Sequence, residues 1–328
     1  MNRAAILSFS DRGAALAARI ARGLDDWSVE CRAPRGDLAA QAAELFASRD
    51  ALIFVGACGI AVRAIAPLVA AKTSDPAVIV VDELGRHVIA LLSGHIGGAN
   101  ALAQRVAAHI GGEAVITTAT DVNGRFSVDE WAARHGVRIS DMTAAKQFSA
   151  EILRRDLPVC SDFPICGPLP NGVYSGESGP IGAIVTCTNR KPFDVTLSLV
   201  PRILHLGLGC KRGTSADALR SAAAAALRDA GLRPEAVKAV ASIDIKRDEE
   251  GLRELGFPLR FYSAEELRAV PGEFSASEFV QSTVGVDNVC ERAAMCSAGE
   301  GAVLLVPKRS ANGVTVAIAC EEWRVCFE

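Results

Sequence analysis

The stretch "AVIVVDELGRHVIALLSGHIGGAN", Ala77–Asn100, decides the fold of the amino-terminal part of the chain. Two apolar runs, residues 77–81 and 87–92, are separated by Asp-Glu-Leu-Gly-Arg, whose residue types favour a hairpin turn. Neither run alternates apolar and polar residues, so both are expected to be strands buried on both faces of a sheet. After Ser93, a histidine stands among three glycines, and an asparagine then leads into an alanine-rich helix.

The same organisation extends toward the amino terminus. Apolar runs alternate there with helical patterns, the runs at residues 3–9, 27–32 and 51–55 and the helices from Asp11, from Asp37 and after Gly56. Strands without polar alternation that are separated by helices indicate a mostly parallel sheet covered on both faces. We therefore predict a first α/β domain over residues 1–136.

The remainder of the chain divides at two changes of pattern. Residues 137–201 contain one expected helix, around 143–155, and then short β-like runs broken by Gly, Pro and Asn, which is typical of a small α+β linker domain. From Arg202 onward, strands and helices alternate again, which predicts a second α/β domain over residues 202–328. The predicted fold class is α/β, with two mostly parallel α/β domains joined by a small α+β linker domain.

Composition limits the classes of function. The chain has 328 residues, a formal net charge of -3 and a pI near 6.0, so it has no overall attraction to nucleic acid or to an anionic membrane. The opening "MNRAAILSFSDRG" is too short an apolar run for a signal or an anchor, and we expect a cytoplasmic protein. Its 10 cysteines lack CxxC or other metal-ligand spacing, so we expect reduced, mostly buried thiols and no protein-bound metal.

The glycine-rich segment after the second apolar run is a candidate site. Gly97 and Gly98 would let backbone N–H groups at a helix start approach an anion. His95 exchanges a proton near neutral pH, and here a catalytic role and a hydrogen-bonded structural role are equally favoured. Ser93 or Asn100 would cap a helix. An alanine at Gly98 is expected to leave stability equal or slightly raised, because it would lie early in that helix.

Two neighbouring segments add candidate residues. Arg63 and Lys72 follow the strand end at Gly56, where parallel sheets bind ligands, although each is also an ordinary residue for a helix. "VITTATD", Val115–Asp121, follows a further strand and places Asp121 at its end, where caps and turns are the alternative explanation.

The carboxy-terminal domain contains a second candidate anion site. "GLGCKRGTS", Gly207–Ser215, joins a strand to a helix but lacks the phosphate-loop pattern, so nucleotide hydrolysis is disfavoured. Lys211, Arg212 and the amides at the helix start near Thr214 would instead face one acidic group. Lys246 follows another strand. Glu291 lies in the first turn of a helix, where an acid often only complements the helix dipole.

These segments together resemble a known family, the cobalt-precorrin-5A hydrolases of the anaerobic, early-cobalt route to cobalamin. The resemblance covers about residues 50 to 320 in family order and rests on "GIAVRAIAPLVAAKTSDPAVIVVDELGRHVIALLSGHIGGAN", "VITTATD", "LGLGCKRGTS", "ASIDIKRDE", "SEFVQSTVGVDNVCERAAM" and "GVTVAIA". It implies opening of the ring A δ-lactone of a cobalt-bearing corrinoid and release of acetaldehyde. It also implies that the cobalt arrives in the substrate, so no cofactor is expected.

The resemblance places roles on particular residues. His95, Asp121 and Lys72 are the expected catalytic residues, with His95 or Asp121 as the base. The expected substrate contacts are Arg63, Gly97, Gly98, Asn100, Lys211, Arg212, Thr214, Lys246 and Glu291. The expected partner is an anionic cobalt-corrinoid substrate rather than nucleic acid or membrane; a homodimer and transient contacts with neighbouring pathway enzymes stay open.

Two other functions are weighed against this one. A non-catalytic corrinoid carrier is the first alternative, because the carboxy-terminal domain resembles a stand-alone module of the aerobic pathway. A sugar-phosphate or nucleotide enzyme is disfavoured, because the phosphate-loop and dinucleotide signatures are absent from the sequence.

Overall fold

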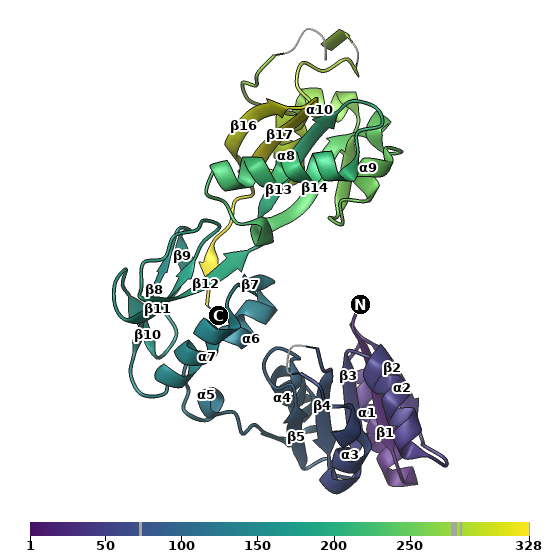
Figure 1. The fold of residues 1–328 in the computed structure, drawn as a ribbon. Helices are drawn as coiled ribbons and strands as arrows, with labels where there is room; N and C mark the ends of the chain where they lie inside the picture. The colour runs from purple at the N-terminus through teal and green to yellow at the C-terminus, as the bar shows by residue number, and fades with distance from the viewer. Residues whose placement is uncertain (72–73, 277–280, 283, 328) are drawn as a thin grey trace. The chain divides into compact units, whose positions relative to one another are not determined.

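The structure is a computed structural model that describes residues 1–71, 74–276, 281–282 and 284–327 (Figure 1). The chain has an α/β fold and forms two compact units, Met1–Ala133 and Arg134–Glu328. Among the described helices, none combines the length and the apolar character needed to cross a membrane.

The first unit is built on one sheet with the strand order β2-β1-β3-β4-β5-β6. Its strands are β1 (Arg3–Ser8), β2 (Ser28–Arg32), β3 (Ala51–Val55), β4 (Ala77–Val81), β5 (His87–Leu92) and β6 (Glu113–Val115). The described pairs are parallel apart from β4 and β5, which form the expected antiparallel hairpin.

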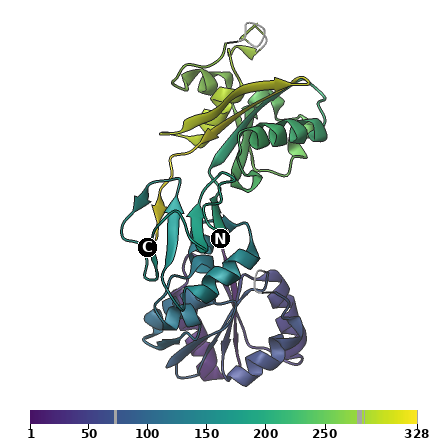
Figure 2. The ribbon, with the colours of Figure 1, turned by 60° about the vertical axis from the view of Figure 1, so that its left-hand side comes forward.

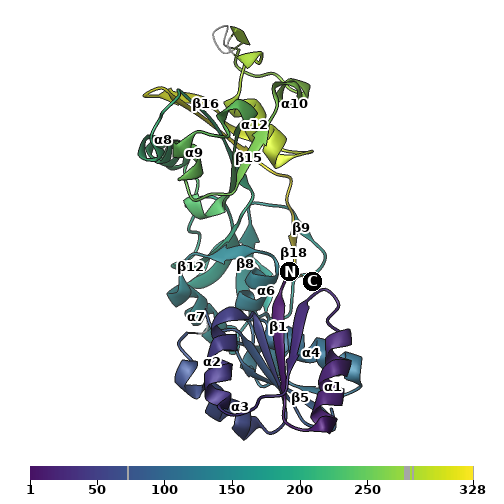
Figure 3. The same ribbon diagram turned by 90° about the vertical axis from the view of Figure 1, so that its right-hand side faces the viewer.

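Helices cover both faces of this sheet, as Figure 3 shows. One face, which includes Ile53 and Val55, packs against α1 (Asp11–Arg22) and α4 (Ala99–Ile110). The other face, which includes Leu52 and Phe54, packs against α2 (Leu38–Ser48) and α3 (Cys58–Ile65). Successive strand residues point to opposite faces, so burial on both faces requires the continuous apolar runs seen in the sequence.

The hairpin decides where the glycine-rich segment lies. Leu92 at the end of β5 pairs with Val78 near the start of β4, whereas Val55 at the end of β3 pairs with Val81 at the end of β4. The strand end at Gly56, which the sequence suggested as a ligand-binding edge, is therefore at the edge of the sheet opposite to His95. β6 runs parallel to β5, so the segment after β6 lies beside the His95 segment.

Short helices complete the first unit. The 3₁₀ turn η1 (Ala66–Leu68) follows α3, and α5 (Ala119–Val122) and α6 (Val128–Arg134) follow β6.

The second unit begins with a sheet of order β10-β8-β11-β12-β7. Its strands are β7 (Val137–Ile139), β8 (Leu157–Ser161), β10 (Val173–Ser175), β11 (Ile181–Val185) and β12 (Val195–Pro201), and α7 (Met142–Glu151) packs against β11 and β12. The described pairs are parallel apart from β12 and β7. This segment is thus a small sheet of mostly parallel strands that carries the one expected helix. β9 (Ile165–Cys166) pairs with β18 (Val325–Cys326) near the end of the chain.

A second sheet of this unit has the order β15-β14-β13-β17-β16. Its strands are β13 (Leu204–Cys210), β14 (Val237–Ile243), β15 (Leu259–Tyr262), β16 (Val303–Ala311) and β17 (Val314–Cys320). The first three are parallel, and β16 and β17 add a long antiparallel hairpin, drawn in yellow in Figure 2. The accompanying helices are α8 (Ala216–Asp229), η2 (Pro234–Ala236), η3 (Asp244–Lys246), α9 (Glu250–Arg253), α10 (Ala264–Ala269) and α12 (Cys290–Ala298).

Helix α12 lies unusually close to β13. A Cβ atom added to Gly207 would be 1.7 Å from the carbonyl oxygen of Cys290, a distance that no side chain tolerates. Gly207 therefore lets the start of α12 rest directly on the sheet. This contact holds residues 288–290 beside the carboxyl ends of β13 and β14, where parallel sheets form binding sites.

Candidate functional site

A partly buried histidine held between two carboxylates forms the candidate site of the first unit. His95 Nε2 is 2.8 Å from Asp121 Oδ2, and His95 Nδ1 is 3.3 Å from Asp129 Oδ1. Only 12% of the His95 side chain is exposed, against 22% of Asp121 and 14% of Asp129. The loop after β5 supplies His95, α5 supplies Asp121, and α6 supplies Asp129.

The surroundings of His95 decide its charge. Burial lowers the pKa of His95, but the hydrogen bonds and negative charges of Asp129 and Asp121 outweigh burial and raise it to about 9. Burial raises the pKa of Asp129, and the hydrogen bond and charge of His95 reverse this, so that it lies below its ordinary value. At neutral pH His95 is therefore an imidazolium, with one nitrogen donating to each carboxylate.

The backbone geometry and close packing of this loop require its glycines. Gly98 is the N-cap of α4 at φ 83°, a left-handed conformation, and its N–H donates to the carbonyl of His95. A Cβ atom at Gly97 would be 2.4 Å from Ser93 Cβ and 2.9 Å from the Ser93 carbonyl oxygen. The expectation that alanine at Gly98 leaves stability equal or raised is wrong, because Gly98 precedes the helix with a positive φ. Its N–H is also already used within the loop.

Asn100 does not cap the helix as expected. It lies buried in the first turn of α4, and its Nδ2 donates to Thr118 Oγ1 at 2.7 Å and to Asp121 Oδ2 at 3.3 Å. Asn100 therefore holds the segment after β6 against the His95 loop, and it donates to the same Asp121 oxygen as His95. Gly94 permits this packing, because a Cβ atom there would be 2.7 Å from Asn100 Oδ1.

Ser93 carries two unfavourable features at once. Its φ is 57°, which a non-glycine residue adopts only at a cost of about 1 kcal/mol or more. Its hydroxyl is the one buried side-chain polar atom found without a hydrogen-bond partner in the described part of the chain. Such a residue is typically retained for a reason other than stability.

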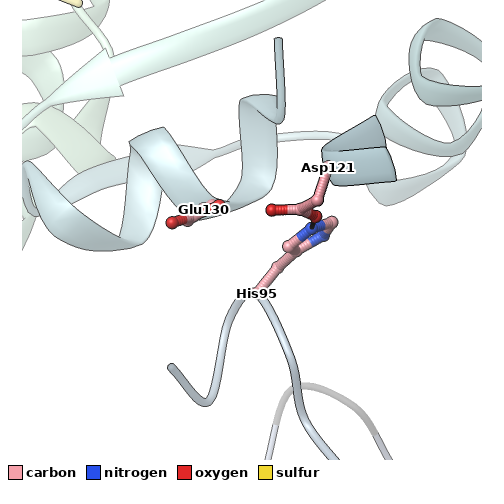
Figure 4. A group of neighbouring side chains, drawn as sticks. All are labelled: His95, Asp121 and Glu130. Carbon is pink, nitrogen blue, oxygen red and sulfur yellow. Dashed lines mark hydrogen bonds and ion pairs between the residues drawn. The ribbon is translucent and has the colours of Figure 1, made fainter. Parts of the chain in front are cut away.

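Three residues of the first unit have ligand atoms near enough to hold a metal ion. Atoms of His95, Asp121 and Glu130 lie within 4.8 Å of one another (Figure 4). Imidazole and carboxylate ligands together suit a divalent transition-metal ion. Such an ion would have to replace the proton that His95 Nε2 now shares with Asp121 Oδ2.

One predicted residue of this unit, Arg63, lies outside the cluster. Arg63 is exposed, and its Nη1 donates to the carbonyl oxygen of Gly59, one turn back along α3. Lys72 lies outside the described residues.

A cavity of about 540 Å³ in the second unit brings together predicted residues from separate segments. Lys211 and Arg212 follow β13, and Lys246 ends η3 after β14. All three line the cavity, together with residues from α12, β16 and β17. The volume lies within the range of small-molecule sites, roughly 300–1,000 Å³.

Two predicted contacts of this unit have other roles. Glu291 is 1% exposed and accepts hydrogen bonds from Ser275, Asn288 and the Lys308 N–H, so its carboxylate joins three segments around the cavity. Thr214 does not line the cavity, and its Oγ1 donates to the carbonyl oxygen of Lys211. A contact of either residue with the substrate stays a prediction.

The amides expected to bind an anion near Thr214 are also engaged. The N–H of Gly213 donates to Glu249 Oε2 at 2.9 Å, and Ser215 caps α8 by accepting from the N–H of Ala218.

Sequence reasoning missed Asp129 and Glu130 of the first site, and Lys308 and Asn288 of the second. Asp129 was read as part of an irregular segment, and only its contact with His95 identifies it. Lys308 and Asn288 line the cavity from β16 and from the start of α12. Asn288 lies three residues before Glu291, and that short spacing was the available signal in the sequence.

Comparison with known proteins identifies the family. Two family models match, "Cobalamin synthesis G N-terminal" over residues 40–121 and "Cobalamin synthesis G C-terminus" over residues 204–319. The first range contains His95 and Asp121, and the second contains Lys211, Lys246 and Lys308.

Three relatives extend this result. "Cobalt-precorrin-5A hydrolase" of Salmonella typhimurium is 38% identical over 304 residues, 86% of this chain and 85% of that protein. The protein of the same name from Priestia megaterium is 34% identical over 299 residues, 84% of this chain and 79% of that protein. "Protein CobE" of Sinorhizobium sp is 37% identical over 121 residues, 35% of this chain and 79% of that protein. Since the first two relatives are similar over most of both chains, this chain belongs to the cobalt-precorrin-5A hydrolase family.

Proposed function

We propose that the protein hydrolyses cobalt-precorrin-5A, opening the ring A δ-lactone and releasing acetaldehyde, as an enzyme of anaerobic cobalamin biosynthesis in the cytoplasm. The carrying observation is the imidazolium of His95 held between Asp121 and Asp129. The names of the two full-length relatives support the substrate. The cobalt is part of that substrate, and we propose that the protein adds no cofactor of its own.

The chemistry needs a proton acceptor and then a proton donor. Water adds to the lactone carbonyl and loses a proton, and the ester C–O bond breaks to give a carboxylic acid and an alcohol. Loss of the alcohol proton turns that carbon into the aldehyde carbon of acetaldehyde. The carbon–carbon bond to the macrocycle breaks, and the macrocycle takes up a proton. One water is consumed and one acetaldehyde is released.

The charge of His95 decides which residue of the cluster can accept a proton. An imidazolium cannot accept a proton, so we propose Asp121 as the base that acts on the attacking water. Its Oδ2 accepts from His95 and Asn100, which leaves Oδ1 as the oxygen that receives the proton. His95 offsets the negative charge that develops at the carbonyl oxygen, and Asp129 keeps His95 protonated and oriented.

The predicted contacts in the second unit are assigned to substrate binding. Lys211, Arg212 and Lys246 line the cavity of the second unit, and we propose that they receive carboxylates of the substrate. Such a macrocycle is large, flat and ringed with carboxylates, so it is recognised by separated basic groups.

The test uses purified protein and cobalt-precorrin-5A. Acetaldehyde is measured by coupling to alcohol dehydrogenase and NADH, and the corrinoid product by mass spectrometry. Asp121→Asn and His95→Gln should each lower turnover by about 10²-fold or more, because positioned proton transfer contributes on that order. The matched control is His109→Gln, because His109 is an exposed histidine whose Nε2 contacts the Arg19 carbonyl.

Two outcomes would count against the proposal. Tight binding of the corrinoid without acetaldehyde release would favour a carrier. Full turnover in folded Asp121→Asn would remove the cluster from the chemistry.

A further inference from the structure

We propose that the cavity of the second unit is a complete binding site for a tetrapyrrole polycarboxylate, able to work without the His95 cluster. In this site Lys308 is a fourth cation, and Glu249 competes with the ligand's carboxylates. The identity of the ligand rests on the proposed function, whereas the chemistry that the cavity selects follows from its own lining.

Four cationic residues from three segments converge on this cavity. Lys211 and Arg212 follow β13, Lys246 follows β14, and Lys308 belongs to β16. Within the described residues, Lys246 alone of these four has a carboxylate at ion-pair distance, Glu249 at 2.9 Å. Three cations without a carboxylate partner among the described residues, together with Lys246, favour an anionic ligand with several separated negative groups.

The wall between these cations suits an apolar body. Ile243, Ile245, Val284 and Val289 line the cavity from the end of β14, from η3 and from the segment that leads into α12. A flat macrocycle would lie against these side chains, while its carboxylates reach the lysines. A compact phosphate would leave this apolar wall in water.

The fold holds parts of two of these cationic residues in place. The stem of Lys211 lies along the β16–β17 turn, where a Cβ atom on Gly313 would be 3.5 Å from its Cδ. The backbone of Lys308 is fixed by its N–H, which donates to the buried Glu291 Oε1 at 2.6 Å. Less conformational freedom is therefore lost when a ligand binds.

Glu249 occupies a position that a ligand carboxylate would take. Its Oε1 is 2.9 Å from Lys246 Nζ, and its Oε2 accepts the Gly213 N–H at 2.9 Å. A ligand that binds Lys246 must displace this carboxylate or bind beside its negative charge. Removing the charge of Glu249 should therefore strengthen binding.

The experiment measures binding by calorimetry with the full chain. The probe is dicyanocobyrinic acid, a stable cobalt corrin with free carboxylates, and its fully methyl-esterified form is the uncharged control ligand. We expect Lys308→Met and Lys211→Met each to weaken binding of the acid about tenfold. We expect Glu249→Gln to strengthen binding about threefold to fivefold.

Two control variants test whether a change in affinity comes from the cavity itself or from the loss of a charge elsewhere in the chain. Lys146→Met removes an exposed lysine of α7 and should leave affinity unchanged. Asp121→Asn should also leave affinity unchanged, because the cavity is proposed to act alone. Binding of the ester as tight as that of the acid, or normal affinity in both lysine variants, would overturn the inference.

The outcome is independent of turnover. Binding with these variant effects but no acetaldehyde release would support the inference and refute the proposed function. Normal turnover with unaltered binding in Lys308→Met would do the reverse.

Discussion

Replacing Asp129 by asparagine tests whether the two carboxylates keep His95 protonated. The amide oxygen of asparagine can still accept from His95 Nδ1, so the change removes the charge and keeps an acceptor for His95. Raising the pKa of His95 from 6.5 to about 9 corresponds to roughly 3 kcal/mol of preference for the imidazolium in the fold. Two carboxylates share this effect, and an opposite charge at such distances shifts a pKa by about 1 to 3. We expect the pKa in Asp129→Asn to fall to between roughly 7 and 8.

The sign of the stability effect follows from the direction of this pKa. A pKa raised by folding adds stability that is fully present below the unfolded value and is lost as the pH rises through the folded value. The stability difference between wild type and Asp129→Asn should therefore be about 1.4 to 2.7 kcal/mol below pH 6.5 and should shrink toward zero above pH 9.

The assay is an NMR titration of the histidine ring protons, with the His95 signal assigned by its loss in His95→Gln. Thermal unfolding at acid and alkaline pH supplies the stability difference. Asp11→Asn, in the exposed first turn of α1, is the matched control for the loss of one negative charge. A wild-type His95 that titrates at or below 6.5 would refute the reasoning, as would an unchanged pKa in folded Asp129→Asn.

Three further predictions concern the stability of the folded protein. Ser93→Gly should raise stability by about 1 kcal/mol, because glycine accepts the positive φ and the unpartnered hydroxyl is removed; a lower melting temperature would contradict this. Gly98→Ala should lower stability by about 1 kcal/mol, because of its positive φ alone, since the added Cβ would meet open space. Gly97→Ala should lower stability by about 3 kcal/mol, because its Cβ would overlap with Ser93. Equal melting temperatures of the two variants would contradict this difference. Glu291→Gln should lose about 3 kcal/mol, measured by denaturant unfolding, because a buried acceptor becomes partly a donor, and near-wild-type stability would show that the cavity wall does not depend on it.

Much of the candidate site could be predicted because its residues stand in short, chemically unusual segments. His95 among glycines and Asp121 after a strand both drew attention, and the structure brings them to 2.8 Å. Lys211, Arg212 and Lys246 were selected at strand ends, and parallel pairing of β13 and β14 brings those ends to one cavity. Strand ends are predictable in this way because adjacent parallel strands finish at the same edge.

The parts that could not be predicted depend on dihedral angles and on burial. Gly98 was placed inside a helix, but its positive φ is set by the hydrogen bonds of the Ser93–Asn100 loop. The sequence shows Glu291 in the first turn of a helix, and only the structure shows that donors from other segments bury it. A sequence pattern gives the position of a residue along an element and does not give the partners that meet its side chain.

The sequence by itself determined the α/β class, the hairpin after β4 and the segments that carry the chemistry, because the period and length of apolar runs follow from burial on one or both faces of a sheet. Only the tertiary structure decided that His95 is a cation, because its charge depends on Asp129, which is 34 residues away in the chain and within hydrogen-bond reach in space. The same holds for Lys308, which joins the cavity because β16 pairs with β17 and β17 pairs with β13. Charge states and cavities arise from contacts between distant segments, and those contacts exist only once the sheets have formed.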